Sequence, residues 1–239
     1  MSDRLHPDNL HPQLTLPLSG VPDFDFESFN ASGNEQLLHR LHQIANGREP
    51  GWLFLSGAAG AGKSHLLQAV CLAAQQAGLH CLFVSGRELQ SLHADVLQEL
   101  SDVELLCIDD LDRLLGQPAW EEQLFHLYNR LREQGGCLLL AASAPPRQLN
   151  IGLEDLRSRF AAMELYAIQP LGDDDKRRVL QRAAQSRGFA LADDVAAYIL
   201  QRSSRDMVSL QKVLNRLDQQ SLREQRLITL PFVKKVMHW

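Results

Sequence analysis

One eight-residue stretch, from Gly57 to Ser64, constrains the fold of this chain more than any other feature. It reads Gly-Ala-Ala-Gly-Ala-Gly-Lys-Ser and fits the pattern G-x-x-x-x-G-K-[ST] at every defined position. An apolar run (WLFLS) precedes it, and a helix-forming run (KSHLLQAVCLAAQQ) follows it. Small residues let a backbone wrap closely around phosphates, and the N-terminus of a helix attracts their charge. The pattern predicts a phosphate-binding loop (P-loop); the alternative is a plain Gly/Ala-rich turn.

The residues of this loop have different expected roles. Lys63, the only lysine in the first 170 residues, should neutralise the charge of the β- and γ-phosphates, and the Ser64 hydroxyl should bind Mg²⁺. The backbone amides of residues 60–65 should point at the phosphates. We therefore expect bound ADP or ATP with Mg²⁺, although the His65 side chain should face the helix surface. The predicted nucleotide-binding set is Gly57, Gly60, Ala61, Gly62, Lys63, Ser64 and His65.

The rest of the chain predicts an α/β fold followed by a small all-α domain. Apolar runs at 52–57, 80–86, 104–110 and 137–143, with a weaker one at 163–168, alternate with helix-length segments, as in a parallel sheet covered on both faces. After residue 170 three helical segments follow, and a run at LITL is a doubtful strand. We expect a flexible tail over 1–22, a nucleotide-binding base over 23–170 and a helical lid over 171–239.

Charge and cysteine content indicate which partners and which cellular compartment the protein could have. The net charge of −5 combines an acidic first 170 residues with a basic remainder, which reads as a solvated helix face or a surface for nucleic acid or an acidic partner. Each of the four cysteines lies in an apolar run and their spacing fits no metal-ligand pattern, so we interpret them as small buried hydrophobic residues. Without a membrane-length apolar run or a signal peptide, the chain is expected in the cytoplasm, with no membrane contact.

A second acidic element lies about 48 residues beyond the loop. The buried run Leu105–Ile108 ends in Asp109 and Asp110, separated from the loop by one predicted strand. Carboxylates at the end of such a strand suit a metal ion and an attacking water. We expect Asp109 to bind Mg²⁺, directly or through water, and Asp110 to act as the base.

Together, GAAGAGKS, LLCIDDLD and LEDLRSRF, followed by a helical lid, make residues 23–239 resemble an AAA+ ATPase of the DnaA replication-initiator type. The resemblance implies that Arg159 is an arginine finger acting on a neighbouring subunit's nucleotide; by sequence alone it could equally be a surface arginine. Phe24, Phe26 and Phe29 precede the first predicted helix, where this family has its adenine-side linker; we expect them to pack on the base, and ordinary core anchoring is the alternative.

The chain departs from this family at two sensor positions. Ser143 best matches the first sensor, where the family more often has a carboxylate. Val208 occupies the position of the second sensor arginine, and Arg205 lies one turn away. These departures leave intrinsic ATPase activity uncertain, and the resemblance implies a nucleotide-binding protein that activates hydrolysis by its partner.

A short apolar motif in the tail indicates a partner. It resembles the peptides that dock on the DNA polymerase III β sliding clamp, because an extended segment can insert alternating leucines into an apolar cleft. The resemblance then implies a regulator that stimulates hydrolysis of DnaA-bound ATP and limits re-initiation. The predicted clamp-binding residues are Gln13, Leu14, Leu16, Pro17 and Leu18.

Two other functions remain as alternatives. A helicase loader or initiator-like protein would bind single-stranded DNA through the basic lid, although no interleaved aromatic and basic stretch is present. A small-molecule P-loop kinase would leave LEDLRSRF and the tail motif unexplained. We expect no sequence-specific recognition of duplex DNA, since the sequence ends directly after the lid. The sequence does not decide whether the protein forms a homo-oligomer.

Overall fold

The computed structural model describes residues 25–204 and 207–239. Strands and helices alternate through the first part of the chain, as the apolar runs predict. In order, the helices and strands are α1 (Glu35–Ala45), β1 (Trp52–Ser56), α2 (Lys63–Gln76), β2 (Cys81–Ser85), α3 (Gly86–Leu89), β3 (Leu105–Asp109), α4 (Pro118–Glu133), β4 (Cys137–Ala142), α5 (Glu154–Ala161) and β5 (Glu164–Ala167). Short 3-10 helices lie at η2 (Ala94–Ser101), η3 (Leu111–Arg113) and η4 (Pro146–Gln148).

The five strands form one parallel sheet in the order β2-β3-β4-β1-β5. Strand β1 lies between β4 and β5, with Phe54 opposite Leu140 on one side and Leu165 on the other. The carboxyl ends of parallel strands meet at one edge of a sheet, where open α/β folds bind ligands. The loop after β1 and the acidic end of β3 therefore share this edge.

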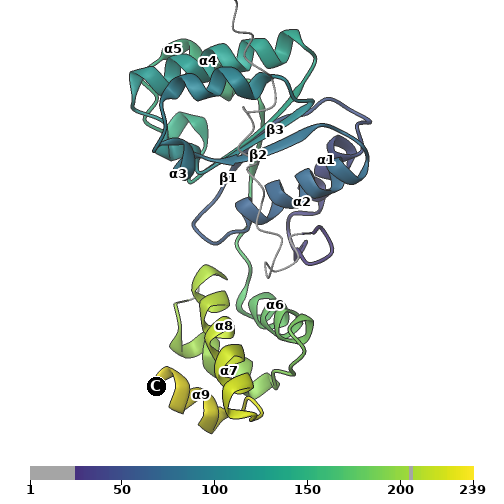
Figure 1. Ribbon diagram of the computed structural model, residues 1–239, viewed down its shortest axis with the longest axis vertical. Helices are drawn as coiled ribbons and strands as arrows, with labels where there is room; N and C mark the ends of the chain where they lie inside the picture. The colour runs from purple at the N-terminus through teal and green to yellow at the C-terminus, as the bar shows by residue number, and fades with distance from the viewer. Residues whose placement is uncertain (1–24, 205–206) are drawn as a thin grey trace, which may run out of the picture.

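Alternate residues of each buried strand supply the cores on the two faces of the sheet. Leu53 and Leu55 of β1 pack with α1 and α2, whereas Phe54 packs with α4 and α5 on the opposite face. Figure 1 shows the same division, with α1 and α2 on one side and α4 and α5 on the other. The predicted parallel sheet covered on both faces is confirmed.

Four helices follow β5: α6 (Asp173–Ser186), α7 (Asp193–Arg202), α8 (Met207–Glu224) and α9 (Leu230–Met237). They enclose a core of their own, which includes Leu180, Ile199 and Leu214. In Figure 1 they gather below the sheet. The prediction of a possible strand at LITL is wrong, because residues 227–229 are irregular and Leu230 begins α9. Pro231 in the first turn suits this helix start.

Across residues 25–204 and 207–239, no helix has the length and apolar character needed to cross a membrane.

Candidate functional site

The P-loop joins strand β1, which lies between β4 and β5, to helix α2, as predicted. Gly60 and Gly62 adopt positive φ angles of 76° and 101°, which residues with a Cβ atom rarely adopt. A Cβ atom at Gly62 would also lie 2.7 Å from Cε2 of Phe29. Glycine is therefore required at position 62 for two reasons, the backbone turn into α2 and the close approach of the Phe29 ring.

Lys63, the first residue of α2, is 9% exposed, and its side chain curls back over the loop. Its ammonium group donates hydrogen bonds to the carbonyl oxygens of Gly57 (2.6 Å) and Ala58 (3.0 Å). These bonds hold a nearly buried positive charge beside the backbone that the motif shapes for phosphates. The geometry suits a phosphate-neutralising lysine.

The structure brings Ser64 and Asp109 together, although they are 45 residues apart in the sequence. Their side chains are hydrogen-bonded, and the Asp109 carboxylate also accepts the Asp110 amide at 2.8 Å. Burial raises the pKa of Asp109 above its ordinary value, which the bond to Ser64 and the charge of Lys63 only partly offset. A hydroxyl and a carboxylate are the oxygen ligands that Mg²⁺ prefers, so these residues fit the predicted ion.

Asp110 lies directly after β3 in the left-handed region, at φ 48°. Its carboxylate is 3.7 Å from Nε of Arg87, and its backbone packs closely against Gly86, where a Cβ atom would lie 2.4 Å from the Asp110 carbonyl oxygen. Such a backbone conformation is costly outside glycine and occurs often at functional sites. Asp110 thus lies at the same edge of the sheet as the P-loop.

Ser143 follows β4 and is bound to a residue that the sequence reasoning did not single out. Its hydroxyl donates to the Asp112 carboxylate at 2.5 Å, and its amide donates to the same group at 2.9 Å. Ser143 and Asp112 thus form a hydrogen-bonded pair just beyond the ends of the neighbouring strands β4 and β3. The sensor role of Ser143 stays a prediction.

The segment before α1 packs on the P-loop helix. Phe29 lies beside the His65 ring, with centroids 5.6 Å apart, and Phe26 contacts His42 at 4.0 Å. The His65 ring nitrogen is 2.8 Å from the Asp25 carbonyl oxygen, and burial lowers the pKa of His65. The side chain of His65 thus faces this segment and not the phosphate side of the loop. Phe24 lies outside the described residues.

Two of the hollows among the described residues lie between the base and the lid. One, of about 60 Å³, lies between Ala58–Ala61 of the loop and Pro170, Leu171, Lys176 and Met207. The other, of about 420 Å³, lies between residues 29–35 and the α6 residues Asp175, Arg178 and Arg182. Asp175 also accepts a hydrogen bond from Asn30 at 3.0 Å. The base and the lid therefore meet beside the loop, so a ligand there would contact both.

Helix α5 carries the other predicted functional residue, Arg159. This arginine is exposed, and its guanidinium carbon lies 5.8 Å from the ring centroid of the buried Tyr128. Tyr128 is held in turn by Trp52, with ring centroids 4.6 Å apart, and by Arg132, which donates to the phenol oxygen at 3.0 Å. The arginine thus rests on a fixed platform at the surface.

A buried carboxylate anchors the start of α5. Glu121 is 2% exposed and accepts three backbone amides, from Gly116 (2.7 Å), Gly152 (3.1 Å) and Leu153 (2.7 Å). Leu153 precedes the first residue of α5. A carboxylate at a helix N-terminus satisfies amides that have no partner within the helix. Sequence reasoning missed Glu121, because it lies in a run of ordinary helix residues.

Three sets of predicted residues cannot be placed in this site. Gln13, Leu14, Leu16, Pro17 and Leu18 lie outside the described residues, as does Arg205, and the side chain of Val208 is not described either. The clamp-binding motif and the second sensor position stay predictions.

A P-loop after β1, two acidic residues at the end of β3 in the same parallel sheet and a helical lid define a P-loop NTPase domain of the AAA+ class. Family models refine this class. Residues 21–165 match the bacterial DnaA ATPase domain, and residues 173–237 match the lid domain of Hda. The chain therefore belongs to the DnaA family of AAA+ proteins, with a lid of the Hda type. This family acts in the regulation of replication initiation.

Solved structures agree on the fold. Domain III of the Thermotoga maritima initiator DnaA aligns with a TM-score of 0.78 at 19% identity, covering 91% of this chain and 97% of that domain. The AMPPCP-bound DnaA of Aquifex aeolicus aligns at 0.71 and 22% identity, over 85% of this chain and 67% of that one. A Thermotoga maritima RuvB aligns at 0.68 and 21% identity, over 89% and 70%. At these identities the likeness supports the fold alone.

Proposed function

We propose that this protein regulates replication initiation by stimulating hydrolysis of ATP bound to DnaA, with Arg159 as an arginine finger in trans. In this proposal residues 23–170 are the nucleotide-binding base, residues 171–239 are the lid, and residues 1–22 dock on the β sliding clamp. Bound ADP or ATP, with Mg²⁺ at Ser64 and Asp109, holds base and lid together. The chain acts mainly on the nucleotide of its partner.

The observation that carries this proposal is the placement of Arg159. It lies on α5, whose buried residues Leu156 and Phe160 pack on one face of the sheet, whereas α2 packs on the other. Its side chain is exposed and supported from below by Tyr128. A guanidinium presented in this way is available to the phosphates of a second molecule, where it would stabilise transition-state charge.

The test is single-turnover hydrolysis of ATP preloaded on DnaA, with DNA-loaded clamp and either this protein or its variants. Arg159→Ala should remove most of the stimulation, on the order of the 10³-fold effect of arginine fingers in other NTPases. Arg159→Lys should recover little, because a lysine lacks the planar fork of donors. The matched control is Arg147→Ala, which removes another exposed arginine, on η4. Full stimulation by Arg159→Ala would refute the proposed finger.

Clamp docking is tested separately, because it rests on the tail motif alone. Deleting Gln13–Leu18 should abolish co-elution with the clamp and leave ADP binding unchanged. Leu5→Ala serves as a control, since it removes an apolar tail residue outside the motif. If the deletion variant still binds the clamp, the motif is not the docking site.

The same proteins distinguish the alternative function, a protein of the initiator or helicase-loader type that grips single-stranded DNA. The basic residues of the lid support it. Fluorescence anisotropy with a labelled oligonucleotide, with and without clamp, is the direct measurement. Tight binding without the clamp, together with no stimulation of DnaA, would favour this alternative over the proposed regulator.

A further inference from the structure

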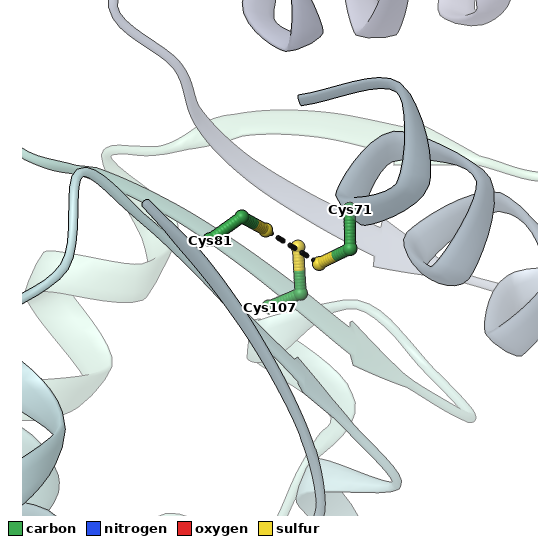
Figure 2. A group of neighbouring side chains, drawn as sticks. All are labelled: Cys71, Cys81 and Cys107. Carbon is green, nitrogen blue, oxygen red and sulfur yellow. Dashed lines mark hydrogen bonds between the residues drawn. The ribbon is translucent and has the colours of Figure 1, made fainter. Parts of the chain in front are cut away.

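Three of the four cysteines meet between the P-loop helix and the sheet, although they come from three different elements. Cys71 lies on α2, Cys81 begins β2 and Cys107 lies within β3, and Figure 2 shows their side chains converging. All three are buried free thiols, and their sulfur atoms lie within 4.8 Å of one another. Sequence spacing gave no sign of this cluster, because each thiol comes from a different element.

Two of the three sulfur atoms are in direct contact. The Sγ atoms of Cys71 and Cys81 are hydrogen-bonded at 2.6 Å. A disulfide bond measures about 2.05 Å, so these sulfurs need to approach by only about half an ångström to bond. The contact joins the P-loop helix to the edge strand of the sheet.

The sheet register sets Cys107 apart from this pair. Cys81 is opposite Leu105 in the parallel ladder, and Phe83 is opposite Cys107, so Cys81 and Cys107 are diagonal neighbours on the same face. Diagonal neighbours in a sheet have Cα atoms about 7–8 Å apart, and disulfides rarely span more than about 7 Å. Cys107 is therefore near enough to hydrogen-bond but badly placed to bond covalently with Cys81.

We propose that Cys71 and Cys81 form an oxidisable dithiol, a modification site that locks α2 to β2. Hydrogen peroxide is the oxidant class. The Cys81 sulfur attacks one peroxide oxygen, which breaks the O–O bond and leaves a sulfenic acid and one water. The Cys71 sulfur then attacks the Cys81 sulfur, and the hydroxyl leaves with the thiol proton as a second water. Two thiols are oxidised, and one peroxide is reduced.

Cys81 is the entry point because of its position. It is 7% exposed at the start of the edge strand, whereas Cys71 is 2% exposed and Cys107 is fully buried. The hydrogen bonds that Cys81 shares with Cys107 and Cys71 also lower its pKa, which favours its reactive thiolate form. The resulting bond would tie the C-terminal half of α2, whose first turn carries Lys63 and Ser64, to the sheet.

Peptide mapping tests the proposal on the unmodified sequence. No trypsin site lies between Cys71 and Cys81, so both fall in the tryptic peptide 64–87, while Cys107 and Cys137 fall in peptides 88–113 and 133–147. The full-length protein is treated with hydrogen peroxide, denatured and alkylated without reductant. Peptide 64–87 should appear two hydrogen atoms lighter and unlabelled, and the other two should carry label. A doubly labelled peptide 64–87, or one linked to peptide 88–113, would overturn the proposal.

Variants test whether oxidation needs only Cys71 and Cys81 or all three cysteines of the cluster. Cys107→Ala should oxidise as the unmodified protein does, as should the control Cys137→Ala, which removes the thiol outside the cluster. Cys71→Ala should leave Cys81 labelled or oxygenated. Oxidation should also raise the apparent melting temperature by about 5 °C or more, through a closed loop of about ten residues. Loss of the light peptide in Cys107→Ala, or an unchanged melting temperature, would contradict the lock.

Discussion

The two faces of the sheet carry their charged residues in opposite ways. On the α2 side, Lys63 and Asp109 are nearly buried, and loop carbonyls and Ser64 within the same chain hold them. On the α5 side, Arg159 is exposed above the Tyr128 ring. A nearly buried charge serves a ligand that enters the protein, whereas an exposed and braced charge can serve another molecule. The comparison separates binding from stimulation, and variants on one face should spare the function of the other.

The largest effect of this kind is expected at Lys63. Lys63→Ala removes a nearly buried ammonium that faces the phosphate loop, so ADP affinity should fall about 100-fold or more, as judged by titration with a fluorescent ADP analogue. Arg159→Ala is the matched variant from the other face and should leave ADP affinity unchanged. Equal losses in the two variants would break the comparison, and unchanged affinity in Lys63→Ala would remove the central role of the loop.

The second prediction concerns the support of the α5 side. Glu121→Gln exchanges one acceptor oxygen for an NH₂ group, which then faces at least one of the three amides that the carboxylate accepts. The free energy of unfolding should fall by about 2 kcal/mol, because a buried amide loses its partner. Urea denaturation measures this loss. Stimulation of DnaA should weaken as well, while ADP affinity stays the same.

The neighbouring residue supplies the control for Glu121. Glu122 has a side chain that is 70% exposed and lies 3.9 Å from His126, so Glu122→Gln should change stability by less than about 0.5 kcal/mol. Similar urea midpoints for the two variants would mean that Glu121 does not anchor α5.

A third prediction sharpens the account of the α2 side. Gly62→Ala places a methyl group at φ 101° and against Phe29, whereas Gly78→Ala meets an equally unfavourable φ of 86° in open space. The backbone term is about 1 kcal/mol in both variants, and the displaced ring should add about 1 kcal/mol to Gly62→Ala alone. The comparison of their urea midpoints isolates the contact between the linker segment and the loop. Identical losses would show that Phe29 moves aside freely.

Much of the fold could be predicted because its signals are local. The apolar runs and the glycine–lysine motif each lie within a few residues, so strand and helix periodicity locates β1, the P-loop and α2 directly. The pairing of Ser64 with Asp109 also follows, since parallel strands end at a common edge. Helix α9 was not predicted, because it is only eight residues long and Pro231 in its first turn interrupts the helical pattern.

Features that depend on three-dimensional packing could not be predicted. Glu121 is one of two adjacent glutamates in α4, and only the fold buries one of them beneath α5 while exposing the other. The cluster formed by Cys71, Cys81 and Cys107 depends on the register of β2 with β3 and on the face that α2 presents. The Ser143–Asp112 pair likewise joins two strand ends. In each case the individual residues can be read from the sequence, but which of them lie in contact is decided only by the fold.

The smallest expected effect has the opposite sign and tests whether the α2 side is built for a ligand rather than for stability. Burial raises the pKa of Asp109, so its charged form costs folding free energy that is absent at low pH and appears as pH rises through the native pKa. Asp109→Asn removes that cost and should raise the free energy of unfolding at neutral pH.

The pH profile separates this explanation from simple repacking. Below the unfolded pKa of about 3.9, Asp109 is protonated in both states, so the advantage of Asp109→Asn should disappear there. Urea titrations of both proteins across this range, without nucleotide, measure the difference. Mg²⁺-dependent tightening of nucleotide binding should be weaker in Asp109→Asn. A variant that is less stable than the unmodified protein at neutral pH would mean that the carboxylate stabilises the fold, so that the contrast between the two faces would rest on Lys63 and Arg159 alone.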